Sequence, residues 1–496
     1  MIPEEILKVN RPKNTIVYAY GKNKDKYAVK ERIGCKYIGG RRLPVTGGTI
    51  GHIVDGVYVP IDVNSIEDVR FSDADLRDYA DIVLCDFLFK DILDELLLVY
   101  SKHDALTIYC ISLLRVANKG IKDYELKEAY DTSFLSILYP DVALSKNTVS
   151  DFLYDLGKAC SRIETFMRNR TKNVSIDHHL LIDGTLKSNE SRINSLSDFS
   201  RKARTKGTRD ISVLFAFDLE KQEPICSKCF PGNMLDSISY ESFIKDNGIK
   251  KGIIVADKGF PSSCAAKEFE NNKELFYLNP IKRNAKVIET YKLCEYEGIL
   301  ENKENILYKK VKCKNTNKWL YSFYDNQRAS KEECDYLRNA KRKDTYSYEN
   351  LIDKKESFGT IVLESNYDMP VEVAYKTFDK RWEIEIVMRF YKSALEFDET
   401  RVHKDYSVIA SEFCDFLSTV LTFRLINKFD ELNLLDVYTY KKLMSILKRA
   451  KKIKTKDDWK LIKTAPSSIE ILKKLSIIKD DNTKPKRKRG RPKTSV

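Results

Sequence analysis

Apolar and polar residues alternate with different periods along the chain, and the changes of period divide it into segments. Up to about residue 71, short β-branched and aromatic runs lie between turns, which predicts a small β-rich module with strands at 14–20, 27–29 and 36–39 and a glycine-punctuated hairpin over 46–59. From 72 to 174, apolar residues recur every three or four positions, which predicts a helical region. The helices expected there cover 74–89, 91–100, 104–118, 123–129 and about 148–168.

The central segment consists of strongly apolar runs, two of which end in an acid and a glycine. The predicted strands lie at 179–183, 211–218, 223–230 and 252–257, and the predicted amphipathic helices at 236–246 and 262–271. The order strand, strand, strand, helix, strand, helix is that of a ribonuclease-H-like fold, which is an α/β domain with a mixed sheet and helices on its faces. In such sheets the catalytic groups gather at the strand ends.

A β-rich insertion is expected over 283–368. Around and within it, strands are predicted at 275–281, 286–297, 306–313, 319–324 and 360–364, with a charged helix near 328–342. The insertion carries basic and aromatic side chains that either contact DNA or belong to a solvent-facing antiparallel sheet. These residues are Lys309, Lys310, Lys312, Lys314, Lys318, Trp319 and Tyr321.

One long helix is predicted over 371–395, directly after Pro370. Its residues form two stripes at helical spacing. One stripe is apolar and contains Trp382, Ile386 and Phe390. The other places the single carboxylate of Glu385 between cations, a pattern that suits a metal ion held by the carboxylate and a phosphate backbone held by the cations. That stripe contains Arg381, Glu385, Met388, Arg389 and Lys392.

Charge and composition narrow the class of protein. The 496 residues include 87 Lys and Arg against 73 Asp and Glu, and the net charge of +14 favours a polyanion as partner. No apolar run reaches the roughly 18–20 residues that a membrane span needs, and no signal peptide opens the chain. Eleven scattered cysteines indicate reduced thiols, so a cytoplasmic, nucleoid-associated protein is expected.

The spacing of four residues in the long helix resembles a known signature. Phe378, Arg381, Glu385 and Lys392 are separated by two, three and six residues. This spacing resembles the tyrosine-arginine-glutamate-lysine (YREK) signature of bacterial insertion-sequence DDE transposases. Phe378 departs from it because the family usually has tyrosine there.

The sequence motifs that this family has upstream of the signature are also present, in the same order. Ile-Asp-Gly-Thr contains Asp183, Pro-Gly-Asn precedes Asp236, and Ala-Asp-Lys-Gly-Phe contains Asp257. The resemblance implies that Asp183, Asp257 and Glu385 are the catalytic carboxylates and bind two Mg²⁺ or Mn²⁺ ions per active site. Asp183 would bridge both ions, while the other two acids would each hold one.

The same resemblance implies an activity and partners. The protein would cut double-stranded DNA at the terminal inverted repeats of its element and join the freed 3′-hydroxyls to target DNA. Arg381 and Lys392 would bind phosphates of the element ends. A homodimer on DNA is expected, and no nucleotide-binding phosphate loop is present that would imply a need for ATP.

Each acid also has an ordinary explanation when it is taken alone. Asp183 and Asp257 could be turn or helix caps, and Glu385 could be a solvated residue paired with Arg381 or Arg389. Two alternative functions therefore stay open. One is a catalytically inactive, transposase-derived DNA-binding protein, and the other is a ribonuclease-H-like nuclease without strand transfer.

The flanking regions add candidate DNA contacts. Capping residues at 145–150 precede a periodic helix, as in a helix-turn-helix or in an ordinary helical hairpin. A mostly apolar helix at about 408–429 is expected on the back of the sheet. In the basic tail, Arg489 and Arg491 belong to an Arg-Gly-Arg-Pro word that resembles an AT-hook, and a solvated tail that binds DNA without preference is the alternative.

The resulting organisation has seven parts. They are the β-rich module 1–71, the helical region 72–174, the first core part 175–282, the insertion 283–368, the second core part 369–430 with the catalytic helix, Lys-rich helices at 431–483 and the tail 484–496.

Two other pairs of potential ligands, one of cysteines and one of histidines, are not interpreted as metal sites. Cys226 and Cys229 lack a second pair nearby, and residues three apart on a strand point to opposite faces. His178 and His179 are strand neighbours that also diverge, so packed or solvent-facing histidines are expected. No role is assigned to His403.

Overall fold

The protein is described by a computed structural model in two compact units. One unit comprises Met1–Arg77 and Ile453–Lys460, and the other comprises Asp78–Lys452 and Leu461–Val496. The structure describes residues 2–21, 25–38, 41–60, 76–189, 191–200, 207–234, 236–257, 259–301, 303–314, 316–355, 357–380, 399–454, 458–462 and 464–478.

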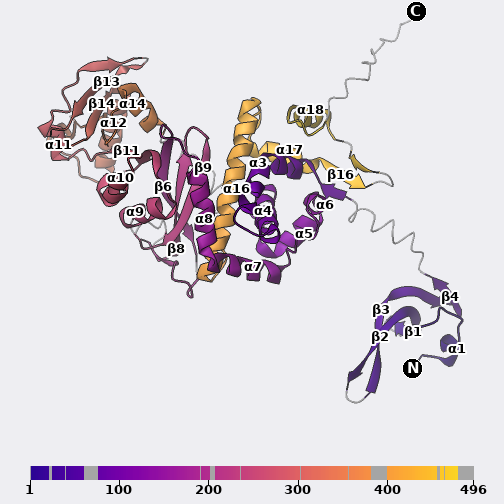
Figure 1. Ribbon diagram of the computed structural model, residues 1–496. Coiled ribbons are helices and arrows are strands. Elements are labelled where there is room, and N and C mark those ends of the chain that lie inside the picture. The colour runs from indigo at the N-terminus through magenta and orange to yellow at the C-terminus, as the bar shows by residue number, and fades with distance from the viewer. Residues whose placement is uncertain are drawn as a thin grey trace, which may run out of the picture. The chain divides into compact units, whose positions relative to one another are not determined.

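The amino-terminal unit contains an antiparallel sheet with the strand order β1-β2-β3-β4 (Figure 1). The elements are α1 (Glu4–Leu7), β1 (Thr15–Tyr20), β2 (Lys26–Ile38), β3 (Arg41–Val54) and β4 (Val57–Pro60). Val17, Val29 and Ile53 form its small core. Asp55 and Gly56 have φ of 50° and 74°, as a two-residue hairpin turn requires, and the hairpin predicted over 46–59 is confirmed.

The region before the central sheet is helical, with several differences from the prediction. Its elements are α3 (Ala80–Leu97), α4 (Lys102–Ala117), η1 (Asp123–Glu125), α5 (Leu126–Asp131), α6 (Leu135–Leu138), α7 (Lys146–Lys158) and α8 (Cys160–Thr171). Residues inside the start of the helix predicted over 74–89 form strand β5 (Leu76–Asp78). The two helices predicted between 74 and 100 are the single helix α3, and the one predicted over 148–168 is divided at Ala159, whose ψ of 39° is not helical. The expected cap is present, because the Ser145 hydroxyl accepts the Thr148 N–H.

The central sheet has the predicted ribonuclease-H-like order. Its elements are β6 (His179–Ser188), β7 (Asp198–Phe199), β8 (Arg209–Asp218), β9 (Glu223–Pro231), α9 (Asp236–Asp246), β10 (Lys251–Ala256), η2 (Ser262–Ala265), α10 (Ala266–Asn271) and β11 (Glu274–Pro280). Strands β6, β8 and β9 pair antiparallel, whereas β10 runs parallel to both β6 and β11. The domain is therefore an α/β fold with a mixed sheet.

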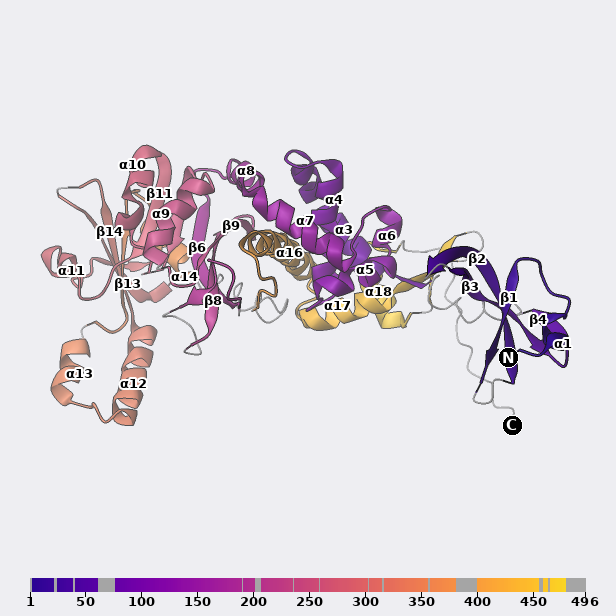
Figure 2. The same cartoon turned by 90° about the horizontal axis from the view of Figure 1, so that it is seen from below.

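The insertion continues this sheet instead of forming a separate one. Its strands are β12 (Gly298–Leu300), β13 (Lys303–Lys312), β14 (Trp319–Asp325) and β15 (Thr360–Ser365), and β15 pairs with β11. Helices α12 (Asn326–Arg342) and α13 (Tyr348–Lys355) project from it (Figure 2). The strand predicted over 286–297 was wrong. Residues 286–290 form helix α11 (Lys286–Thr290), because Val287 and Tyr291, four apart, pack on one small cluster.

Hydrogen bonds to the Glu332 side chain attach helix α12 to the sheet. The carboxylate accepts hydrogen bonds from Arg283 and Arg328, both at 2.9 Å, and from the Gly359 N–H at 3.0 Å. Burial alone would raise the pKa of Glu332, but the hydrogen bonds to the two arginines lower it to about 2. Because the folded pKa is below the ordinary value of about 4.3, the stabilisation is complete above that value and is lost as the pH falls toward 2.

Glu332→Gln is therefore expected to lower the free energy of unfolding by about 2–3 kcal/mol at pH 7, and by progressively less below pH 4. Denaturant unfolding of both proteins between pH 7 and pH 3 measures this difference. Glu333→Gln is the matched control, because Glu333 on the same helix forms a long ion pair with Lys355, at 3.5 Å. A loss that is equal at pH 7 and pH 3 would contradict the assignment.

Helix α16 (Asp405–Glu431) covers the face of the central sheet that carries Asp183. It packs against β9 and against α3, α4 and α7. Lys187 of β6 pairs with α16, and Lys187 faces the same side as Asp183 because alternate strand residues share a face. The helix predicted over 408–429 therefore exists, but its expected place on the back of the sheet was wrong. Gly157 permits the contact with α7, since a Cβ there would lie 1.7 Å from the Tyr406 carbonyl oxygen.

The carboxyl-terminal elements are two Lys-rich helices with two strands between them. They are α17 (Tyr440–Arg449), β16 (Lys451–Lys454), β17 (Trp459–Leu461) and α18 (Pro466–Lys474), and the two strands form a small sheet with β5 (Leu76–Asp78). The AT-hook-like word with Arg489 and Arg491 lies outside the described residues. Among the residues that the structure describes, no helix has the length and apolar character needed to cross a bilayer.

Candidate active site

Asp183 lies on β6, an interior strand of the sheet, and not at its end as predicted, because β6 continues to Ser188. The apolar residues Leu180, Leu181 and Ile182 before it are buried and hold β6 between β8 and β10. Asp183 itself is half-buried, pairs in register with Phe215 of β8, and accepts the Gly184 N–H on Oδ1 at 2.8 Å. Its position is therefore fixed by a strand that is paired on both sides.

Asp257 directly follows β10, and its side chain is exposed. Its carbonyl oxygen accepts the Phe260 N–H at 2.9 Å, which closes a turn after the strand. The last registered pair between the parallel strands is Ala256 with Ile182. Asp257 follows Ala256 and Asp183 follows Ile182, so the two acids occupy neighbouring backbone positions.

Both acids belong to the same face of the sheet. Leu181 and Val255, each two residues before one of the acids, belong to one apolar cluster. Since side chains alternate along a strand, Asp183 and Asp257 face the side of that cluster. Neighbouring strands lie about 4.8 Å apart, so the backbones of the two predicted acids occupy adjacent positions.

Helix α14 (Val371–Asp379) covers the same face and is the described part of the helix predicted over 371–395. Val371, Ala374 and Tyr375 are buried in the cluster that contains Leu181 and Val255. The Tyr375 ring also meets Phe323 of β14 at a centroid distance of 5.1 Å. The helix therefore approaches the acids from the side of the insertion.

Three further predicted residues on that helix fall outside the described part of the chain. They are Arg381, Glu385 and Lys392, all within 381–398. The chain is described again where Glu399 bridges to Ser188 and the Thr400 N–H donates to the Ser188 carbonyl oxygen at 2.9 Å. This contact lies at the end of β6, five residues after Asp183.

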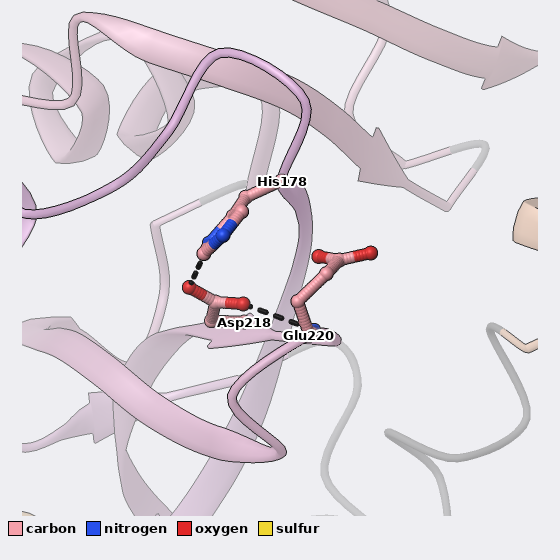
Figure 3. Close-up of side chains that lie close together, drawn as sticks. All are labelled: His178, Asp218 and Glu220. Atoms are coloured by element: carbon pink, nitrogen blue, oxygen red, sulfur yellow. Dashed lines mark hydrogen bonds and ion pairs between the residues drawn. The ribbon is translucent and has the colours of Figure 1, made fainter.

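Among the described residues, a different set of potential metal ligands lies close together. His178, Asp218 and Glu220 offer ligand atoms within 4.8 Å of one another (Figure 3). His178 Nδ1 lies 2.8 Å from Asp218 Oδ2, and the other Asp218 oxygen accepts the N–H groups of Glu220 and Lys221. These bonds tie the start of β6 to the turn after β8, so the cluster is explained as a turn cap. It contains none of the predicted acids.

Cys226 and Cys229 do not share a face of β9. Cys226 is registered with Ala216 and Cys229 with Val213, which are three apart on β8 and point to opposite sides. Burial raises the pKa of both thiols. The divergence predicted from the spacing is confirmed.

Sequence reasoning missed a buried charge next to the site. Lys187 is fully buried on the strand and face of Asp183, and it pairs with Glu412 and Asp415. Burial alone would lower its pKa, but the two carboxylates raise it. The signal for this buried charge in the sequence is a lysine at a position of an apolar strand whose side chain points into the core.

The central segment can be compared with known proteins once this geometry is established. Residues 175–408 match the family model described as a transposase DDE domain. The matched transposase DDE domain starts just before β6, ends just inside α16, and includes the insertion. No curated protein matches the chain.

The solved structures that are similar to the chain include two transposase complexes. A piggyBac transposase synaptic complex with hairpin DNA has 12% identity and a TM-score of 0.39, over 75% of this chain and 80% of that one. A Mos1 transposase paired-end complex with the left transposon end has 13% identity and a TM-score of 0.14, over 31% of this chain and 58% of that one.

Proposed function

We propose that the protein is a DNA transposase of the bacterial insertion-sequence type, which cuts at the ends of its element and joins the 3′-hydroxyls to target DNA. Asp183, Asp257 and Glu385 are the carboxylates of its active site. The observation that supports this proposal most strongly is the neighbouring position of Asp183 and Asp257 on parallel strands, on the face that α14 covers.

The donor chemistry fits hard divalent cations. Two ionised carboxylates on adjacent strands repel each other unless a cation lies between them, and carboxylate oxygens are the ligands that Mg²⁺ and Mn²⁺ prefer. Half-buried Asp183 provides a fixed ligand, whereas exposed Asp257 lies open to a DNA strand. When bound, two such ions activate the attacking oxygen and stabilise the leaving oxygen of a phosphodiester.

Glu385 completes the set in this proposal. It lies six residues after Asp379, the end of α14, and fifteen residues before Thr400. The chain is therefore attached beside the strand of Asp183 on both sides of Glu385, by α14 in the cluster of Leu181 and by Thr400 at Ser188, the end of β6. These two attachments support a third carboxylate in the same site.

The basic residues provide the DNA contacts. Arg381 and Lys392 bind phosphates of the element ends, and the chain acts as a homodimer on double-stranded DNA. Arg489 and Arg491 add contacts to the minor groove. These roles are consistent with the net charge of +14. Each cationic side chain that contacts a phosphate releases counterions from the DNA, and this release favours binding.

The test is cleavage and joining on DNA that carries the terminal inverted repeats of the element, with a labelled end and a target plasmid. With Mg²⁺ or Mn²⁺ we expect nicks at the element ends and covalent transfer of the label to the plasmid, and neither product with a chelator. Cleavage without transfer would instead support a nuclease. Specific binding without cleavage in either metal would support an inactive DNA-binding protein.

A further inference from the structure

A cavity of about 510 Å³ lies between the helical region and the segment that leads into α16. Helix α7, which packs along α16, forms one wall (Figure 1). The turn at 120–124 and residues 399–404 form the others. Of the described acids of the candidate active site, neither Asp183 nor Asp257 lines this cavity, whereas His403, for which the sequence suggests no role, does. Pockets for small ligands span about 300–1,000 Å³, so the cavity has the size of a binding site.

Paired charges form the buried side of the cavity. Arg115 of α4 donates to Asp415 Oδ1 at 2.7 Å and to Asp123 Oδ1 at 3.1 Å. It also donates to the carbonyl oxygen of Ser411 at 2.9 Å. Asp415 accepts a further hydrogen bond from Lys187 at 2.8 Å. Each of these two acids therefore has a cationic partner, and the charge that a ligand meets comes from the rim.

The rim carries more unpaired lysines than unpaired acids. Three lysines that line the cavity are exposed and form no ion pair with another described residue. They are Lys122, Lys146 and Lys404. Among the described acids of the rim, Asp151 has no cationic partner, whereas Glu399 pairs with Arg401 at 3.2 Å. The excess of positive charge favours an anionic ligand.

Two tyrosines and a buried hydroxyl also line the cavity. Tyr124 has an exposed fraction of 54%, so its ring is open to a planar ligand. The Tyr154 ring lies 4.8 Å from Lys404 Nζ and meets Tyr406 edge to face at 5.5 Å. Ser407 is 8% exposed, and its hydroxyl forms no hydrogen bond with another described residue. A buried hydroxyl is normally satisfied by protein, water or a ligand, so Ser407 has capacity left for a ligand.

This combination fits a nucleotide better than other anions. Lysines bind a phosphate, and an aromatic ring stacks on a base. The carboxylate of Asp151 repels a phosphate, but it can accept a hydrogen bond from the N–H that every base carries on its pairing edge. Inorganic phosphate would leave the rings and Asp151 without a partner. Because a duplex keeps its bases stacked inside, the nucleotide must be unpaired to reach both the lysines and a ring.

We propose that the cavity binds one unpaired nucleotide of a DNA strand, with its phosphate at Lys146 and Lys404 and its base against Tyr124. The net charge of +14 favours a strand over a free nucleotide, because a polyanion gains from every further cation nearby. This contact goes beyond the DNA contacts of the proposed function and needs no metal ion, so either can hold without the other.

The test is binding of a labelled oligothymidylate of about 12 nucleotides to the full chain, measured by fluorescence anisotropy in the presence of a chelator. Tyr124→Leu should weaken this binding about tenfold, because the base loses its stacking partner. Tyr124→Phe keeps the ring and should bind like the unsubstituted protein. Neither change should alter the melting temperature or the binding of a duplex of the same length, because Tyr124 is exposed and a paired base does not reach its ring.

Lys146→Gln tests the phosphate contact. It should reduce the slope of log affinity against log salt concentration by about 0.7, which is the value for one phosphate contact on a single strand. Lys158→Gln is the matched control, because Lys158 is the exposed last residue of the same helix and does not line the cavity. The slope for this control should stay unaltered.

Several outcomes would overturn this proposal. One is unaltered binding by Tyr124→Leu, or an equal loss on single strand and duplex. Another is an equal change of slope in Lys146→Gln and Lys158→Gln, which would indicate general attraction between charges. Binding of thymidine monophosphate without binding of the oligothymidylate would assign the cavity to a free nucleotide instead. An absence of cleavage at the element ends, with the expected binding results, would contradict the proposed function alone.

Discussion

Asp257→Asn is expected to reduce cleavage of element-end DNA by about a thousandfold or more, with little change in the melting temperature. Loss of a charged metal ligand removes several kcal/mol of transition-state stabilisation, and each 1.36 kcal/mol is a factor of ten in rate. Asp257 is exposed and lies beyond the end of β10, so the sheet does not depend on its charge. The measurement is single-turnover cleavage in saturating Mg²⁺, with thermal unfolding of the same preparation.

Glu274→Gln is the control for this change. It alters one acid in the same way on the neighbouring strand β11, where Glu274 is exposed and pairs with Lys251 at 3.2 Å. Its register partner is Lys251 at the start of β10, so it lies at the opposite end of the strands from Asp257. Full cleavage is expected. Cleavage by Asp257→Asn at the unsubstituted rate would remove Asp257 from the site.

The central fold could be predicted because its elements are marked locally. The strands of Asp183 and Asp257 contain apolar runs, and burial on both faces is what such runs indicate. The predicted end at 183 was wrong, however, because β6 stays paired with β8 as far as Ser188. The mixed sheet was predicted from the order of the elements, whereas the parallel pairing of these two strands is seen in the structure. The resemblance nevertheless assigned both acids to one site.

The remaining features depend on contacts between residues far apart in sequence. Lys187 finds its partners 225 and 228 residues later, and no local pattern encodes that pairing. The same contact decides which face α16 covers, and a mostly apolar helix that is buried over much of its circumference has no clear polar side to indicate it. The insertion joins the core sheet through β15 and β11, which a sequence pattern of separate strands does not reveal.

Lys187→Met is expected to lower the free energy of unfolding by about 3–5 kcal/mol at pH 7, because it leaves Glu412 and Asp415 buried without their shared cation. Burial already raises the pKa of Glu412, and Lys187 opposes that rise. Without Lys187 the pKa rises further, so the loss should grow with increasing pH and shrink when Glu412 is protonated. Denaturant unfolding from pH 5 to pH 8 measures this trend, and a loss independent of pH would contradict it.

Adding Glu412→Leu to Lys187→Met tests whether the lost stability comes from the buried charge that is left without its partner. The double variant removes both charges and keeps the bond between Arg115 and Asp415, so most of the lost stability should return. The Thr400 hydroxyl then has no Glu412 carboxylate to donate to, so a deficit of about 1 kcal/mol should remain. Denaturant unfolding of the single and double variants measures both effects. A double variant that is no more stable than Lys187→Met would mean that the uncompensated charge of Glu412 is not the cause of the loss.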